Sequence, residues 1–176
     1  MSRSRLALPV LALTGILASP AFGASSPIVP VAAPAPVKLA VFDFELEDTS
    51  AGISAIASDA TELANATEAI RRLLTQSGRY QVVATGGDAD ATKTRSLHDC
   101  SGCDAAIALK LGADQSLVGV IRRVSRTEYT FRFALRDART GDLISGGDSG
   151  LRMGANYSWS KGASRLISDH LLDQPQ

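Results

Sequence analysis

The stretch over residues 128–137 constrains the fold most, because polar and apolar side chains alternate along it without interruption. A period of two is typical of a strand with one buried face. The positions predicted to face the core are Tyr129, Phe131, Phe133 and Leu135. Strands are also predicted before it, over 115–124, and after it, over 143–149, with a Thr-Gly-Asp turn at 140–142. Three strands with short links predict an antiparallel meander.

The other patterned segments place helices between strands. Residues 38–45 alternate as a strand, 54–77 repeat apolar residues every three or four positions as an amphipathic helix does, and 80–83 is a short strand. Further helices are predicted over 104–111 and 158–172. The order β-α-β-α-β-β-β-α predicts an α+β fold, a five-stranded mixed sheet with helices packed on it.

The N-terminus has the three-part plan of a secretory signal peptide. Arg3 and Arg5 precede an uncharged apolar run over 6–17, and small residues follow up to Gly23. The run is shorter than the about 20 residues that a bilayer crossing needs, so we expect cleavage, a periplasmic location and no membrane insertion of the mature chain. Residues 1–23 are therefore expected to leave the 176-residue chain.

The remainder is long enough for one domain with a sizeable core. We expect a Pro/Ala-rich linker over 24–37, a single α+β domain over 38–172 and a short tail over 173–176. Lys and Arg total 18 and so do Asp and Glu, so the formal net charge is zero. This balance does not predict nucleic-acid binding, and no glycine-rich fingerprint predicts a nucleotide or other cofactor.

Five sequence pieces, taken in order, carry a resemblance to a known family. They are residues 39–44, 73–83, the pair Cys100 and Cys103, 111–119 and 136–142. The series resembles the uncharacterised bacterial envelope domains called domain of unknown function 2380 or 3280. It is more remotely similar to the amino-terminal domain of TolB and to the periplasmic domain of the curli secretion protein CsgG.

The resemblance implies a fold and a compartment, and it supplies no catalytic residue. The better-known relatives act in envelope assembly through protein contacts, which implies that the partner is another envelope protein. The chain lacks both the propeller repeats that follow the TolB domain and the long pore-forming segments of the curli channel. It would be the bare domain.

The chemically most specific motif is the sequence His-Asp-Cys-Ser-Gly-Cys-Asp at 98–104. In an oxidising compartment, Cys100 and Cys103 most simply form a disulfide that fixes the entry of the following helix. A redox interpretation gives Cys103 a lowered thiol pKa near the helix N-terminus. A metal site formed by His98, Cys100 and Cys103 is a weaker alternative because no fourth ligand is evident.

Two charged groups are candidate surfaces. The acidic group comprises Asp43, Glu45, Glu47 and Asp48. Strict alternation would put Asp43 and Glu45 together, on the face opposite Phe42 and Phe44, where they could perturb each other's pKa. Charges at a strand end are usually solvated, so we favour a solvated surface over a catalytic cleft.

The basic group lies on the later strands. Arg132 and Arg136 share the strand face opposite Phe131 and Phe133, and Arg122 is on the preceding strand. Such a face can bind acidic partners, although cross-strand pairs with Glu128 or Asp137 would leave it merely solvated.

The sequence therefore predicts a non-catalytic periplasmic binding or assembly module, with Arg122, Arg132 and Arg136 as its possible partner surface. The alternatives are a thiol-redox or metal-handling accessory protein built on Cys100 and Cys103, and an enzyme of unrecognised type with its cleft near Asp43 and Glu45.

Overall fold

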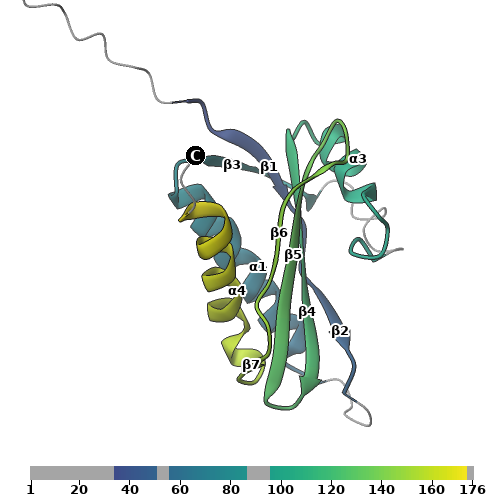
Figure 1. Ribbon diagram of the computed structural model, residues 1–176, viewed down its shortest axis with the longest axis vertical. Coiled ribbons are helices and arrows are strands. Elements are labelled where there is room, and N and C mark those ends of the chain that lie inside the picture. Colours follow the sequence, from purple (N-terminus) through teal and green to yellow (C-terminus); the bar gives the residue numbers. More distant parts are fainter. Residues whose placement is uncertain (1–33, 51–55, 87–95, 174–176) are drawn as a thin grey trace, which may run out of the picture. The chain divides into compact units, whose positions relative to one another are not determined.

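A mixed sheet of seven strands organises the molecule (Figure 1). The computed structural model describes residues 34–50, 56–86 and 96–173. The strands are β1 (Val37–Val41), β2 (Glu45–Asp48), β3 (Tyr80–Val83), β4 (Gln115–Ser125), β5 (Glu128–Asp137), β6 (Leu143–Asp148) and β7 (Arg152–Met153). The main order is β3-β1-β4-β5-β6, and β2 pairs with β4 and β7 with β5. Most of the predicted N-terminal signal and linker lies outside the described residues.

The strand directions confirm the predicted mixed sheet and its meander. β1 runs parallel to both β3 and β4, whereas β4, β5 and β6 are antiparallel neighbours. The number of strands exceeds the five predicted because the first strand is divided into β1 and β2, and because β7 forms where a loop was expected.

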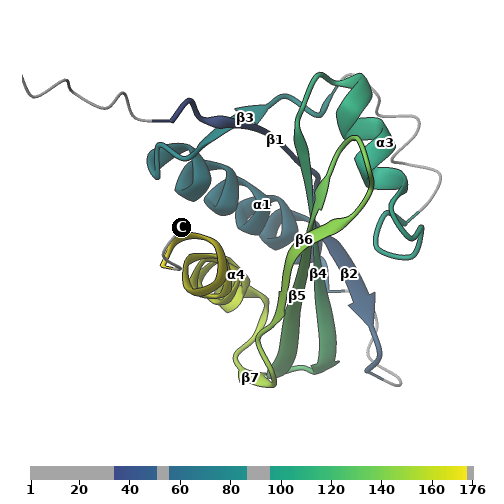
Figure 2. The ribbon, with the colours of Figure 1, turned by 45° about the horizontal axis from the view of Figure 1, so that its top comes forward.

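Helices cover the two faces of the sheet unequally (Figure 2). They are α1 (Asp59–Gln76), α3 (Cys103–Lys110) and α4 (Trp159–Ile167), with the 3-10 turn η2 (Asn156–Ser158) before α4 and the π-helical turn η3 (Ser168–Leu172) after it. Both α1 and α4 lie on one face, here called the helical face. α3 lies on the other face, here called the open face.

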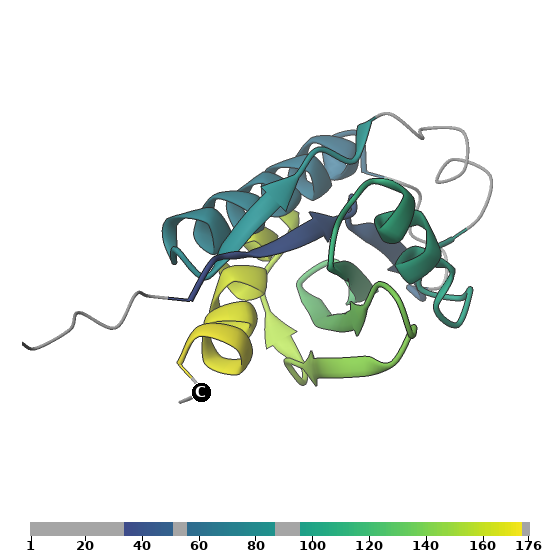
Figure 3. The same cartoon turned by 90° about the horizontal axis from the view of Figure 1, so that it is seen from above.

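The helical face holds the main core. Ile70 and Leu74 of α1 are fully buried, as the sequence pattern predicted, and Ala66 is buried with them, whereas Ala60 and Ala64 of the predicted apolar face are exposed. The sheet contributes the alternating residues Tyr129, Phe131, Phe133 and Leu135, all buried as expected. Figure 3 shows α1 running beside β3, with α4 next to it. At the chain's end Leu171 is buried and His170 is exposed.

The open face is only partly covered. α3 packs a second, smaller cluster over β1 and the start of β4, in which Ala40, Phe42, Val118 and Ala108 are buried. Farther along the sheet the side chain of Arg132 is 60% exposed. Within the described part of the chain, this end of the open face is left exposed.

A β-bulge divides the first predicted strand. Val41 lies opposite Leu117 and Glu45 lies opposite Val120. The segment from β1 to β2 therefore advances four residues where β4 advances three. The additional residue shifts every later side chain to the other face of the sheet. Phe44 consequently joins the core of the helical face, and the prediction that it shares a face with Phe42 is wrong.

Arg123, the neighbour of Arg122 on β4, is buried in the helical face. Arg123 is 3% exposed, forms an ion pair with Asp59 at the start of α1, and lies 5.6 Å from the centre of the Trp159 ring. Asn156 donates a hydrogen bond to the same carboxylate at 3.1 Å. This network joins β4 to the N-terminal ends of both α1 and α4.

No helix among the described residues is long and apolar enough to cross a membrane.

Candidate functional site

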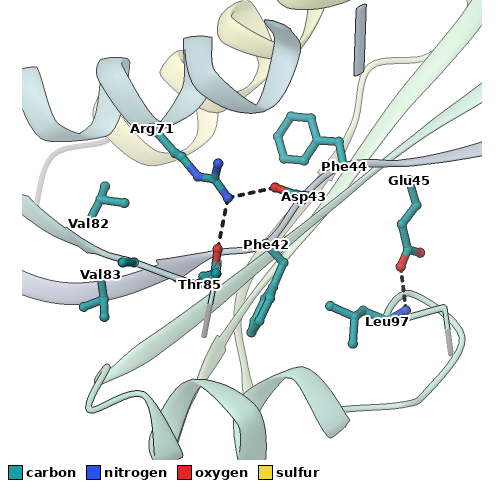
Figure 4. A pocket seen from close by; sticks show the side chains of 11 residues that line it. Phe42, Asp43, Phe44, Glu45, Arg71, Val82, Val83, Thr85 and Leu97 are labelled. Atoms are coloured by element: carbon teal, nitrogen blue, oxygen red, sulfur yellow. Dashed lines mark hydrogen bonds and ion pairs between the residues drawn. The ribbon is translucent and has the colours of Figure 1, made fainter. Parts of the chain in front are cut away.

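A pocket of about 660 Å³ lies at the carboxyl ends of β1 and β3 (Figure 4). Its wall is formed by the bulge at 42–45, the end of β3 with the residues after it at 82–86, and the side chains of Arg71 and Leu97. The chain goes from the first strand pair to α1 on the helical face and from β3 to α3 on the open face. The pocket therefore lies at the carboxyl edge of this parallel strand pair, between a connection to one face and a connection to the other.

Arg71 of α1 closes one side of this pocket. Its Nη2 donates hydrogen bonds to the Asp43 carboxylate at 2.9 Å and to the Val41 carbonyl at 2.8 Å, and lies 3.1 Å from the Thr85 hydroxyl. Its Nη1 donates to Glu68 at 2.6 Å. The hydrogen bonds of the guanidinium thus hold α1 against the strand ends, and the carboxylates of Asp43 and Glu68 balance its charge.

Glu45 points away from Asp43, toward the segment before α3 (Figure 4). It accepts hydrogen bonds from the Ser96 hydroxyl at 2.7 Å and from the Leu97 amide at 2.6 Å, and it also contacts the His98 Nδ1. Burial alone would raise the pKa of Glu45, but these hydrogen bonds, that of His98 first, hold the pKa below its ordinary value.

The bulge therefore contradicts the predicted pairing of Asp43 with Glu45 on one face. Asp43 bonds Arg71 on one side of the sheet, and Glu45 bonds the segment at 96–98 on the other. The two carboxylates are thus held by separate partners, although both line the pocket. The pocket is present, but its carboxylates serve to position neighbouring chain segments.

The cysteine motif forms the turn that leads into α3. Cys100 and Cys103 are joined by a disulfide with a Cα–Cα distance of 5.5 Å, and Cys103 is the first residue of the helix. Gly102 precedes it with φ of 107°, a left-handed conformation that favours glycine. The structure thus brings both cysteines to a helix N-terminus.

The ring nitrogens of His98 contact groups other than the two sulfurs. Its Nδ1 faces Glu45 and Ser96, and its Nε2 lies 3.2 Å from Asp99. With both sulfurs in the disulfide, the predicted set of His98, Cys100 and Cys103 offers no thiolate ligand. No group of three His, Cys, Asp or Glu residues in the described part of the chain could hold a metal ion.

The three arginines predicted to form a partner surface all lie on the open face, with partners other than those the sequence proposed. Arg122 bonds Glu47 through two nitrogens, at 3.0 and 2.7 Å, and this contact lowers the pKa of Glu47 and raises that of Arg122. Arg132 lies 3.3 Å from Asp148, and Arg136 lies 3.8 Å from Asp104. Glu128 and Asp137 pair with none of them in the described residues.

A second pocket, of about 220 Å³, opens on this face between β5 and the turn before α3. Its floor is apolar, formed by Val118, Val120 and Ala134, and its rim carries Arg132 and Arg136. Further rim residues are Glu47, His98, Ser101, Gly102 and Asp104. The structure thereby brings Arg132 and Arg136 of the predicted basic group to the cysteine motif, although they are about 30 residues apart in sequence.

Sequence reasoning missed Arg71 and treated Glu47 only as one of a solvated group. Arg71 is one of several charged residues along an amphipathic helix, and nothing in its spacing marks it. Glu47 meets Arg122 because β2 pairs with β4 in a register set by the bulge. No local pattern could have found either contact.

Known proteins resemble this chain in fold. No curated protein matches it. The LpoB C-terminal domain from Salmonella enterica is similar at 21% identity and a TM-score of 0.49, over 69% of this chain and 85% of that one. Lipoprotein GNA1162 from Neisseria meningitidis is similar at 14% identity and a TM-score of 0.48, over 68% of this chain and 82% of that one.

The remote similarity to TolB is also found. TolB from Acinetobacter baumannii is 14% identical with a TM-score of 0.43, and the match covers 80% of this chain but 29% of that one. Likenesses at these identities concern the fold alone. The similarity to CsgG stays a prediction.

The family assignment rests on the sequence itself. A family described as protein of unknown function (DUF2380), with the family name DUF3280, matches residues 37–171, from the first residue of β1 into η3. The chain belongs to this family, DUF3280.

Proposed function

We propose that this protein is exported to the periplasm and acts there as a non-catalytic module that binds another envelope protein through its open face. The observation that carries the proposal is the uncovered part of that face, where an apolar-floored pocket is rimmed by Arg132 and Arg136. Charged rims around small apolar floors are typical of protein contact sites.

Export is supported by two independent features. Residues 1–23 have the composition of a signal peptide. Cys100 and Cys103 form a disulfide. Disulfides persist in oxidising compartments and are rare in reducing ones. The pocket at the end of β1 gives no support to catalysis, because Asp43, Glu45 and Arg71 are each held by neighbouring protein groups.

The test is site-specific photo-crosslinking in the native host. A photoreactive amino acid replaces Ser101, which is exposed on the rim of the open-face pocket, and the matched control replaces Arg72, which is exposed on α1. We expect a discrete crosslinked protein from position 101 alone, in the periplasmic fraction, with Ala24 as the mature N-terminus. Retention in the cytoplasm would refute export, and equal or absent crosslinking from both positions would refute binding through the open face.

A second candidate function uses the cysteines for thiol exchange. It is favoured by the position of Cys103, because a thiolate at the first residue of a helix is stabilised by the helix dipole. Rapid thiol blocking of the cellular protein without reductant separates the two proposals. A fully oxidised pool supports the binding module, whereas a mixed or blocked pool supports a redox accessory protein.

A further inference from the structure

The pocket on the open face is the size of a side chain. Its volume of about 220 Å³ is below the range of about 300–1,000 Å³ that drug-sized ligands occupy. Val118, Val120 and Ala134 give it an apolar floor. Gly146 of β6 lies opposite Ala134 and adds no side chain of its own. The pocket is therefore suited to one apolar side chain that enters from above the sheet.

Two arginines beside the floor keep unused hydrogen-bond donors. Arg132 contacts Asp148 through Nε alone, at 3.3 Å, and both side chains are well exposed. Arg136 donates from Nη1 to the Gly141 carbonyl at 3.2 Å, while its Nε is 3.8 Å from Asp104. Within the described residues, nothing accepts from the remaining nitrogens of Arg132 or from Nη2 of Arg136.

Arg122 differs from these two arginines. Its guanidinium already donates two parallel hydrogen bonds to Glu47. A carboxylate of a partner would need the same two nitrogens. Unlike Arg122, Arg132 and Arg136 can thus still take a carboxylate. A partner carboxylate complements their unused donors.

The spacing of Arg132 and Arg136 along β5 indicates which residues of a bound extended chain would contact them. Arg132, Ala134 and Arg136 occupy alternate positions of one strand and so share one face. The two arginines are about 13 Å apart along the strand, at about 3.3 Å per residue. An extended chain lying along β5 repeats the same spacing, so its residues i and i+4 would meet the arginines while residue i+2 lies over Ala134.

We propose that the open-face pocket binds an extended acidic segment of the partner protein, with an apolar side chain in the pocket and a carboxylate two residues before and two residues after it. This inference rests on the proposed function and specifies its partner chemistry. The apolar side chain supplies burial, and the two carboxylates fix direction and register along β5.

The test uses the mature full chain, labelled with ¹⁵N, and a capped peptide of sequence Glu-Ser-Leu-Ser-Glu. We expect saturable shifts of the amide signals of Val118, Val120 and Ala134. Matched peptides replace both Glu by Gln, or Leu by Ser, and each should bind at least about tenfold more weakly, which corresponds to about 1.4 kcal/mol. Binding should also weaken as salt is raised.

Variants of the protein complete the test. Arg132→Glu should weaken binding of the acidic peptide at least about tenfold, whereas Arg152→Glu, which changes an exposed arginine on β7, should not. Ala134→Leu fills the pocket and should have the same effect as Arg132→Glu while both charges remain. The thermal midpoints of all variants, measured in parallel, exclude loss of folding as the cause.

Several outcomes would overturn the inference. They are equal binding of the Glu and Gln peptides, saturable shifts elsewhere on the chain, no shifts at millimolar peptide, and full competition by inorganic phosphate, which would mark a site for free anions. If any of these occurred while position 101 still crosslinked a periplasmic protein, the binding function would stand and the acidic-segment chemistry alone would be wrong.

Discussion

The ring of Phe44 lies directly on Gly119 of β4, where any other residue would place its Cβ among the ring carbons. The ring is 4% exposed and its centre is 5.2 Å from that of Phe131. The bulge turns Phe44 onto the helical face, and the missing side chain at position 119 makes room for it there. The two features depend on each other.

Gly119→Ala should therefore destabilise the protein by about 1–3 kcal/mol, the usual cost of overpacking a core. The Phe44 ring cannot move away easily because it also packs against the ring of Phe131. Denaturant unfolding followed by circular dichroism gives the free energy. Gly86→Ala is the control, since a Cβ there meets nothing within 4 Å. Equal stability of the two variants would show that Phe44 does not rest on Gly119.

The buried ion pair of Arg123 with Asp59 gives a second prediction. Removing one partner leaves the other charge buried, so Arg123→Met should destabilise the fold by about 3–5 kcal/mol. Arg165→Ala removes an exposed i,i+4 pair on α4 and should cost only about 0.3–0.5 kcal/mol. Thermal and urea unfolding of both variants measures the difference, and similar losses would contradict a structural role for Arg123.

Glu45 predicts a specific pH dependence. Its pKa in the folded chain is below the ordinary value of 4.5, so its contribution to stability is present above that value and is lost as the pH falls through the lowered pKa. The free energy of unfolding should be larger for the natural chain than for Glu45→Gln near neutral pH. The gap should narrow below pH 4.5. A gap that is constant down to about pH 3 would contradict the hydrogen bonds from 96–98.

The disulfide should stabilise the turn into α3 modestly. It closes a loop between residues three apart in sequence, for which chain entropy predicts about 2 kcal/mol. The double variant Cys100→Ser with Cys103→Ser should lose about this amount, with the loss of amide-exchange protection concentrated in α3. Reductant should destabilise the natural chain and leave the double variant unchanged. Loss of the whole fold in the double variant would assign the disulfide a larger role.

Much of the fold could be predicted because the patterns involved are local. The alternation over 128–137 and the four-residue repeat of α1 each report which side of one element is buried. Gly78 and Gly112, both with positive φ, follow the two helices where the sequence placed their ends. The family resemblance rested on the same ordered elements, and it holds over residues 37–171.

The candidate sites were less predictable because their members come from separate elements. Alternation marked Arg132 and Arg136 as neighbours on one face of β5. It could not show that Asp104 and His98 would border the same pocket, since this depends on how α3 packs on β4. The predicted partners Glu128 and Asp137 lie on β5 itself, whereas the real partners come from β2, β6 and α3.

The sequence by itself determined the order of helices and strands, the buried side of each long element and the family. Tertiary structure alone decided the bulge between β1 and β2, and with it the separation of Asp43 from Glu45. The reason is physical: a strand's period of two assigns faces only while the pairing register is unbroken. Where one residue is added, packing decides which side chain is buried, and here Phe44 is buried because Gly119 leaves space for its ring.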